Sequence, residues 1–304
     1  MTQRLLGKVI VVTGAGAGVG KEIALESARQ GARVVVNDLG VSMDGAGASA
    51  GPAHETVEQI RAAGGEATAN TDSVAEWSSA QRIIQQALDV YGRIDGLVNN
   101  AGNLRDGIFH KMSEENFDAV VKVHLKGCFN MARAVAPHFK SQESGSIVHM
   151  TSTSGLIGNF AQANYAAAKM GVVGLSKSIA LDMALFRVRS NCIAPFAFTR
   201  MVSSIPTDTP EGIARTLVNQ RMEVAKIAPF TCALLTDEAS GVSGQIFGVR
   251  SNEIYLFSQP RPIRTAHRSE GWTVDTCLEV AIPMMKPSFF PLDNSRDVFT
   301  WDPV

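Results

Sequence analysis

Thr13-Gly14-Ala15-Gly16-Ala17-Gly18-Val19-Gly20 is the stretch that decides the fold of this 304-residue chain. It follows an apolar β-branched run and opens an amphipathic segment, so it predicts a turn between a strand and a helix. Glycines let such a turn tighten and approach a pyrophosphate, whose charge lies at the helix N-terminus. The spacing is TGxxxGxG rather than GxGxxG. We expect Gly14, Gly18, Val19 and Gly20 beside a dinucleotide; an ordinary tight turn is the alternative.

Outward from this turn, short β-branched runs alternate with longer amphipathic stretches, as in repeated βαβ units. Expected strands are 9–13, 33–38, 66–70, 96–99, 146–151, 189–194 and 245–248. Expected helices are 19–30, 55–63, 74–91, 114–140, 163–186 and 210–235. The pattern predicts the α/β class, with a Rossmann-type, doubly wound, seven-stranded parallel sheet in three α/β/α layers.

Two regions depart from a minimal sheet. Residues 40–52, rich in glycine, alanine and serine, predict a long loop after the second strand. Residues 251–304 hold six of the twelve prolines and one helical stretch, 273–282. We expect one NAD-binding domain with an integral substrate site over 1–250. The extension over 251–304, with its aromatic side chains, is expected to pack on the body or on a neighbouring subunit.

Composition excludes several classes of protein. Hydrophobic residues make up 45% and charged residues 19%, which excludes intrinsic disorder. A net charge of −1 argues against nucleic-acid or anionic-membrane partners, and no apolar run is long enough to span a membrane. The four cysteines are scattered, with no metal-binding spacing. With reduced cysteines, no N-terminal targeting pattern and no retention or peroxisomal signal in Trp301-Asp302-Pro303-Val304, we expect a cytoplasmic protein without a metal.

Acidic and amide residues at strand ends predict how the nucleotide is held. Asp38 closes the second strand, where a carboxylate accepts hydrogen bonds from ribose hydroxyls and repels the 2′-phosphate of NADP. NAD is therefore favoured; a solvated strand-end carboxylate is the alternative. Asp72 and Ser73 are placed to meet the adenine edge. Asn99-Asn100-Ala101-Gly102 ends the fourth strand where a nucleotide would pass.

Tyr165 and Lys169 lie four residues apart on one expected helix, about one turn from each other. A free tyrosine is ionised only about one part in a thousand at pH 7, because its pKa is about 10. A nearby ammonium and an oxidised nicotinamide lower that pKa, which makes the tyrosine a usable acid/base. Ser152, thirteen residues earlier at a strand end, can hold the substrate oxygen. Alone, a YxxxK pair is more often an exposed helix pair.

Together these motifs resemble the short-chain dehydrogenase/reductase family over about residues 7–250. The resemblance implies that Tyr165 is the acid/base, Lys169 binds the nicotinamide ribose and Ser152 polarises the substrate oxygen. It also implies that Thr13 and Asn100 brace the turn and that Pro195 and Thr199 lie at the nicotinamide.

Two positions depart from the family pattern. His124 stands where an asparagine usually supports a proton-relay water; it could order that water, or make only a structural hydrogen bond. Pro195-Phe196 replaces the usual Pro-Gly.

Other segments resemble a particular branch of the family. Three segments are similar to the dehydrogenase domain of peroxisomal multifunctional enzyme type 2: Val36-Asn37-Asp38-Leu39-Gly40, Val123-His124-Leu125-Lys126-Gly127 and Gly158-Asn159-Phe160-Ala161-Gln162-Ala163-Asn164-Tyr165. They also resemble actinobacterial 17β-hydroxysteroid and 3-hydroxyacyl-CoA dehydrogenases of sterol side-chain degradation. This implies NAD-dependent oxidation of a (3R)-hydroxyacyl-CoA, with a steroid side-chain thioester preferred to a free 17β-hydroxysteroid.

Three other functions stay open: an NADPH-dependent 3-oxoacyl reductase, a dehydrogenase of free steroids or other secondary alcohols, and a non-catalytic nucleotide sensor. The family also implies a homodimer or homotetramer through the helices 114–140 and 163–186, and a substrate lid between Thr199 and Pro229.

Overall fold

The sheet begins with a strand that is buried on both faces. In the computed structural model, which describes residues 3–41, 47, 50–197, 218 and 220–304, β1 (Val9–Thr13) is buried along its whole length. Ile10 and Val12 pack into the core on one face, and Val9 and Val11 into the core on the other. A strand that is apolar at every position needs helices on both sides, which makes a three-layer fold.

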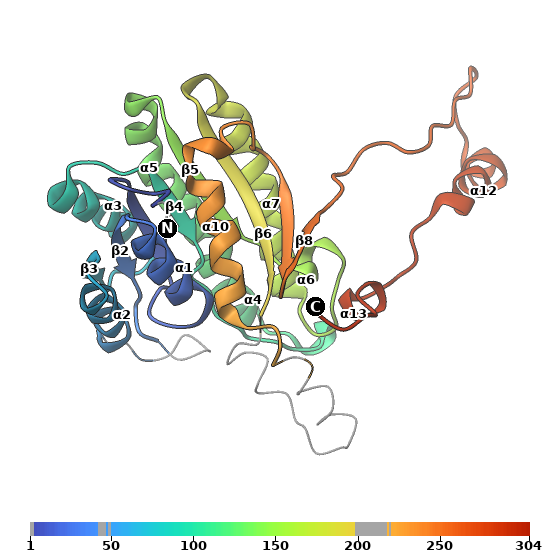
Figure 1. The fold of residues 1–304 in the computed structure, drawn as a ribbon. Helices are drawn as coiled ribbons and strands as arrows, with labels where there is room; N and C mark the ends of the chain where they lie inside the picture. Colours follow the sequence, from blue (N-terminus) through green and yellow to red (C-terminus); the bar gives the residue numbers. More distant parts are fainter. Residues whose placement is uncertain (1–2, 42–46, 48–49, 198–217, 219) are drawn as a thin grey trace, which may run out of the picture.

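The strand order is β3-β2-β1-β4-β5-β6-β7-β8 (Figure 1). The remaining strands are β2 (Arg33–Asn37), β3 (Glu66–Asn70), β4 (Gly96–Asn99), β5 (Gly145–Met150), β6 (Val188–Phe196), β7 (Ile246–Arg250) and β8 (Glu253–Leu256). The direction of winding reverses between β1 and β4, so the carboxyl ends of these two strands open a crevice where ligands bind in doubly wound folds.

Two helical layers cover the sheet. One contains α1 (Gly18–Arg29), α2 (Gly51–Ala62) and α10 (Ala228–Leu235). The other contains α3 (Trp77–Tyr91), α4 (Glu114–Val121), α5 (Gly127–Gln142) and α7 (Ala163–Asp182). Short helices and turns are η1 (Phe109–Lys111), η2 (Lys122–Lys126), α6 (Thr153–Leu156), η3 (Ala184–Phe186), η4 (Val224–Ile227) and η5 (Asp237–Ala239). The expected α/β class, doubly wound sheet and three layers are thus confirmed.

The seven expected parallel strands are all present, and the sheet has one further edge strand, β8, that the sequence did not predict. β8 pairs antiparallel with β7 across a two-residue turn, in which Ser251 has a φ of 53°. Only alternate side chains of β8 are partly buried, and Ile254 and Leu256 stay exposed. The strand is short and its apolar residues Ile254 and Leu256 face outward, so the sequence pattern did not predict a strand here.

The helix expected over 114–140 is interrupted. α4 and α5 are joined by η2, a single π-helical turn. Such turns insert one residue into the helical ladder and are frequent at functional sites. The helix expected over 210–235 is described only in part, as η4 and α10, because residues 210–217 and 219 lie outside the described residues.

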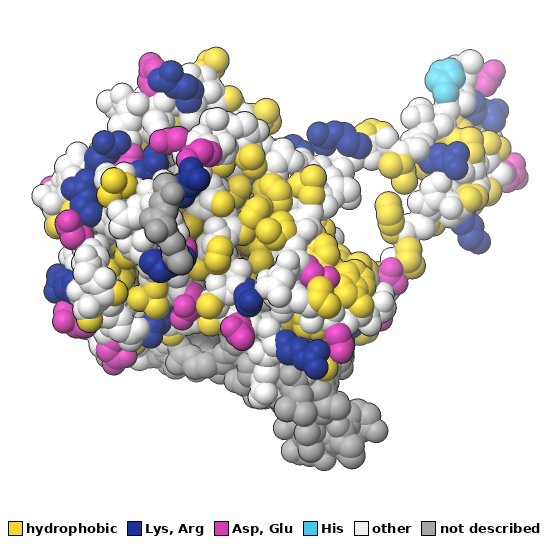
Figure 2. All heavy atoms as spheres, in the orientation of Figure 1, with side chains coloured by type: hydrophobic (Ala, Val, Ile, Leu, Met, Phe, Trp, Pro, Cys, Tyr) yellow, Lys and Arg dark blue, Asp and Glu magenta, His cyan; other side chains and the backbone are white. Residues whose placement is uncertain are grey.

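The C-terminal extension leaves the body and comes back to it (Figure 1). Its outer part, the arm (residues 260–292), carries α11 (Val274–Thr276), the π-helical η6 (Cys277–Ala281), α12 (Ile282–Met285) and η7 (Lys286–Ser288). Apolar side chains on the arm are exposed, among them Val274 at 76% and Phe290 at 85% (Figure 2). The chain then returns through α13 (Ser295–Val298) to β8. Within the described part of the chain, no helix is long and apolar enough to cross a membrane.

Candidate active site

In the turn between β1 and α1, the backbone at Gly20 lies close to the backbone at Gly14 and to the Asn100 side chain. A Cβ on Gly20 would lie 2.2 Å from the Gly14 carbonyl oxygen and 2.4 Å from Asn100 Nδ2, so only glycine fits. Gly18 has a φ of +57°, and a Cβ there would face open space. No side chain in the described structure caps the N-terminus of α1 at Ala17. The amides at this helix end are therefore open to an anion such as a pyrophosphate.

Thr13 and Asn100 join this turn to the end of β4. Thr13 Oγ1 accepts hydrogen bonds from the amides of Asn100 (3.0 Å) and Ala101 (3.1 Å). Asn100 Nδ2 in turn donates to the carbonyls of Thr13 and Gly14, both at 3.0 Å. The two loops flanking the crevice are thereby held as one unit.

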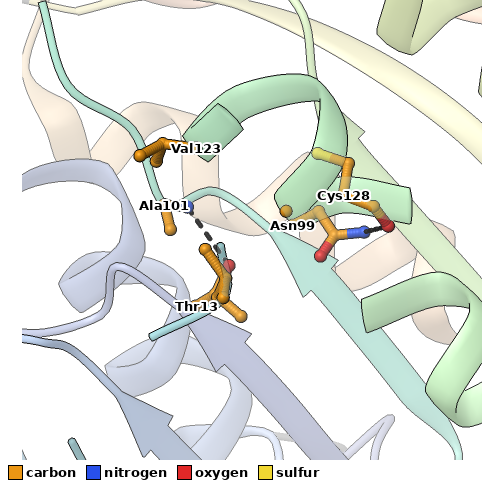
Figure 3. Close-up of a pocket in the computed structure, with 7 residues that line it drawn as sticks. Thr13, Asn99, Ala101, Val123 and Cys128 are labelled. Carbon is orange, nitrogen blue, oxygen red and sulfur yellow. Dashed lines mark hydrogen bonds between the residues drawn. The ribbon is translucent and has the colours of Figure 1, made fainter. Parts of the chain in front are cut away.

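A small pocket lies behind this junction (Figure 3). Its lining is mainly apolar: Thr13, Val74, Asn99, Ala101, Val123, Gly127 and Cys128. Burial raises the pKa of the Cys128 thiol to about 11, so at neutral pH this thiol stays protonated and is a poor nucleophile. The pocket therefore belongs to the packing beneath the nucleotide turn.

The carboxylate of Asp38 is tied to the same turn. Its Oδ2 accepts the Gly16 amide at 2.7 Å and its Oδ1 accepts the Gly40 amide at 2.7 Å. These bonds fix the side chain beside the glycine-rich turn, and carboxylate oxygens have further lone pairs for ribose hydroxyls. Asp72 is paired with Arg82, and Ser73 Oγ accepts the Ala75 amide, so both predicted adenine contacts also have local partners.

Tyr165 and Lys169 lie on one face of α7, as their spacing predicts. Lys169 Nζ is 5.5 Å from the centroid of the Tyr165 ring and donates to the Met150 carbonyl at 2.6 Å. Burial lowers the pKa of Lys169 to about 8. Burial also raises the pKa of Tyr165 to about 12, against the lowering effect of a hydrogen bond with Ser152. Without further positive charge, the phenol therefore keeps its proton at neutral pH.

Ser152 sits where β5 ends and α6 begins. Its Oγ accepts the Ser154 amide at 3.1 Å and donates to Ser154 Oγ at 3.2 Å. Ser154 Oγ donates to Gln162 Oε1 and accepts from Asn159 Nδ2, both at 2.8 Å. Sequence reasoning missed this chain of polar side chains. The available signal was the polar residues Ser154, Asn159 and Gln162, which are interspersed among apolar residues and glycines between Ser152 and Tyr165.

His124 lies in the π-helical turn η2 and meets Tyr165 edge-on, with ring centroids 5.1 Å apart. Its Nε2 is 2.8 Å from the Asn103 carbonyl oxygen. Its Nδ1 is buried and has no hydrogen-bond partner in the described structure. Burial lowers the pKa of His124 to about 3, so the ring is neutral. A Cβ on Gly102 would lie 2.2 Å from this ring, so Gly102 leaves the room that His124 occupies.

The remaining predicted positions fall at the same edge of the sheet or outside the description. Pro195 lies near the end of β6, paired with Val249 of β7. Thr199 and most of the expected lid lie outside the described residues. No group of metal-ligating side chains occurs within the described ranges.

The fold and this constellation define an oxidoreductase that acts on CH–OH groups with a nicotinamide dinucleotide. A family model described as short chain dehydrogenase matches residues 8–209, and the chain belongs to that family.

The relatives are similar over most of this chain. A short-chain type dehydrogenase/reductase of Mycobacterium tuberculosis is 51% identical over 233 residues, 77% of this chain and 79% of that protein. The peroxisomal hydratase-dehydrogenase-epimerase of Saccharomyces cerevisiae is 45% identical over 240 residues, 79% of this chain but 25% of the yeast protein. The chain thus spans about a quarter of that larger relative.

Two solved structures share the fold. A short chain dehydrogenase from Mycobacterium avium superposes with a TM-score of 0.84 at 36% identity, covering 96% of this chain and 99% of the other. A 7α-hydroxysteroid dehydrogenase, in complex with NADH and 7-oxo glycochenodeoxycholic acid, has a TM-score of 0.73 at 31% identity. That match covers 83% of this chain and 96% of the other.

Proposed function

We propose that this protein oxidises a 3-hydroxyacyl-CoA to the 3-oxoacyl-CoA with NAD, and that a steroid side-chain thioester is its preferred substrate. The observation that carries the proposal is the grouping of Tyr165, Lys169 and Ser152 beside the nucleotide turn. The similarity to the yeast peroxisomal hydratase-dehydrogenase-epimerase supports the thioester, and the 7-oxo glycochenodeoxycholic acid complex of the similar 7α-hydroxysteroid dehydrogenase supports a steroid body.

The proposed roles follow from the geometry. Ser152 donates a hydrogen bond to the substrate oxygen, and ionised Tyr165 accepts the hydroxyl proton while the carbon loses hydride. The bound cofactor supplies the hydride acceptor and a positive charge. That charge, together with the Lys169 ammonium, lowers the pKa of Tyr165 from its raised value. His124 packs against the Tyr165 ring, and its free Nδ1 is a suitable site for a relay water.

The residues of the crevice fit the cofactor in the following way. The amides at Gly18, Val19 and Gly20 hold the pyrophosphate, with Gly14 shaping the turn. Asp38 holds the adenosine ribose, Asp72 and Ser73 the adenine, and Asn100, Ala101 and Gly102 flank the path to the nicotinamide. Tyr165, Lys169, Pro195 and Thr199 hold the nicotinamide half. The carboxylate of Asp38 is the reason for proposing NAD rather than NADP.

A substrate panel tests the function. NADH formation is followed with straight-chain and steroid (3R)-hydroxyacyl-CoAs beside free 17β-hydroxysteroids. Contacts to the CoA handle help to position the reacting carbon, so the thioesters should give the higher kcat/KM. If only free steroids or simple alcohols react, the proposed thioester substrate is refuted, but the dehydrogenase activity stands. Tighter binding of NADPH than NADH would favour the 3-oxoacyl reductase instead.

The assembly and location are part of the same proposal. We propose a homodimer or homotetramer in the cytoplasm, in which α4, α5 and α7 form the interface and the 251–304 extension contacts the body or a neighbouring subunit. The exposed apolar side chains on α7 support the interface, and the packing of Phe299 on Phe196 and Tyr255 supports the contact of the extension with the body.

A further inference from the structure

The C-terminal end of the chain, which we call the anchor (residues 293–304), grips the body at two places. At one, the amide and the Oγ of Ser295 donate to the Gly158 carbonyl at 3.0 and 3.2 Å. At the other, the Phe299 ring packs edge-on against Phe196, with centroids 4.7 Å apart, and lies 5.3 Å from the Tyr255 ring.

Further bonds fix the last residues on β7 and β8. Trp301 Nε1 donates to Glu253 Oε1 at 2.7 Å, and the Arg250 guanidinium lies 5.6 Å above the Trp301 ring. The Arg250 guanidinium also donates to the Trp301 carbonyl. The Asn252 amide donates to the Val304 carbonyl at 2.8 Å. The anchor is therefore packed against the body, unlike the exposed arm that precedes it.

The two segments that the anchor contacts, the loop at Gly158 and the end of β6 at Phe196, flank the part of the site where the alcohol substrate is proposed to bind. Gly158 precedes Asn159, whose side chain bonds Ser154, which in turn bonds Ser152. Phe196 directly follows Pro195 at the end of β6, next to the strand that leads to Ser152. The hydrogen bonds and ring contacts described for the anchor reach neither the glycine-rich turn nor Asp38. The contacts of the anchor therefore lie on the alcohol side of the site, away from the residues proposed to hold the pyrophosphate and the adenosine ribose.

We infer that the anchor is a positioning element for the alcohol substrate: it holds the 157–160 loop and Phe196 in place, and through them the Ser152 hydroxyl. A misplacement of about 1 Å at a reacting group can reduce the rate about a hundredfold. Loss of the anchor should therefore impair handling of the alcohol and leave dinucleotide binding intact. This inference rests on the proposed oxidoreductase activity but not on the proposal that the substrate is a CoA thioester.

The test compares Phe299→Ala with Phe299→Leu, which restores apolar volume, and with Phe290→Ala, an exposed phenylalanine on the arm. For Phe299→Ala we expect kcat/KM for the best accepted secondary alcohol to fall by about ten- to a hundredfold. Phe299→Leu should recover part of that loss, and Phe290→Ala should match the wild type. NADH affinity, measured by fluorescence titration, should stay within about threefold in all three variants, as expected when a change acts on one ligand only.

A second measurement does not depend on turnover. Amide hydrogen exchange over residues 153–160, with NADH bound, should speed up in Ser295→Ala, because the loop loses the Ser295 Oγ bond to Gly158. It should also speed up in Phe299→Ala, because the anchor that carries Ser295 loses its packing against Phe196. Unchanged exchange, or a kcat/KM within twofold of the wild type, would overturn the inference. An equal loss of NADH and alcohol binding would also overturn it, because the anchor would then be a general stabiliser. A wild-type protein that oxidises no alcohol would refute the proposed function, whereas the exchange result would still decide the role of the anchor.

Discussion

Tyr165 is the residue on which the proposed chemistry depends. Tyr165→Phe keeps the ring that packs against His124 but removes the only proposed proton acceptor. Turnover should fall by about 10²–10⁴-fold, the usual contribution of a general acid/base, while NADH affinity falls much less, because the ring stays in place. Initial rates and a titration check this, with Tyr91→Phe on α3 as the matched control. A rate near that of the wild type would refute the mechanism.

Asp38 carries the proposed preference for NAD. Asp38→Asn keeps the shape and one acceptor for the amides of Gly16 and Gly40 but removes the charge that repels a 2′-phosphate. The ratio of NADH to NADPH affinity should fall by about tenfold or more, which corresponds to about 1.4 kcal/mol. Asp182→Asn at the end of α7 is the control. An unchanged ratio would mean that another residue sets the preference.

For single residues, the sequence predicts the position of those that a local pattern determines. The four-residue spacing of Tyr165 and Lys169 places them together on any helix. The bond from Ser295 to Gly158 spans 137 positions, so no local pattern could reveal it. The position of His124 Nδ1, which has no hydrogen-bond partner among the described residues, likewise depends on the π-helical turn and on Gly102.

The β1–α1 turn has no room for a side chain at Gly20. Gly20→Ala would place a methyl group 2.2 Å from a backbone oxygen that cannot move without opening the turn. Overpacking of this kind costs about 1–3 kcal/mol, and the distorted turn should also lose NADH affinity. Chemical denaturation and NADH titration test this. Gly241→Ala, where the new Cβ meets nothing within 4 Å, should be close to neutral.

Elements with strong periodicity were predictable, and elements defined by pairing were not. The apolar runs of β1 and β2 mark buried strands whatever their partners are. β8 exists because the chain reverses at Ser251 and pairs with β7, and its own alternation is too short to predict this. The π-helical turn inside 114–142 has a helical pattern on both sides, so the sequence predicted one unbroken helix.

For the whole molecule, the buried histidines predict how stability depends on pH. Burial lowers the pKa of both His124 and His149 to about 3 from 6.5. Between these values the unfolded chain binds protons that the folded chain does not, so stability is lost as the pH falls below 6.5. From pH 7 to pH 5 each histidine should contribute a loss of about 2 kcal/mol.

Urea unfolding at both pH values measures this loss. His149→Gln, which keeps an acceptor for Asn99 but does not titrate, should show a smaller loss than the wild type. Equal losses in the two proteins would show that His149 is not responsible.

The proposed assembly depends on the outer face of α7. Ala167, Met170, Gly174 and Leu181 are exposed there at helical spacing, Met170 at 42% and Leu181 at 73%. A charge buried in a subunit contact is strongly unfavourable, so Met170→Glu should dissociate the oligomer. Light scattering should give a multiple of 32.4 kDa for the wild type and 32.4 kDa for the variant. Val90→Glu, on α3, should keep the wild-type mass; a monomeric wild type would contradict the proposal.

Because both ends of the arm are held on the body, the length of the arm should have little effect on folding. The arm is closed at both ends, by Lys177 bonding Gln259 where it leaves and by Ser295 bonding Gly158 where it returns. The entropy lost on closing a loop grows only with the logarithm of its length, about 0.6 kcal/mol for each doubling. Insertions or deletions within 260–292 should therefore be nearly neutral for folding. The arm is thus the part of this molecule where new sequence can be added without disturbing the anchor.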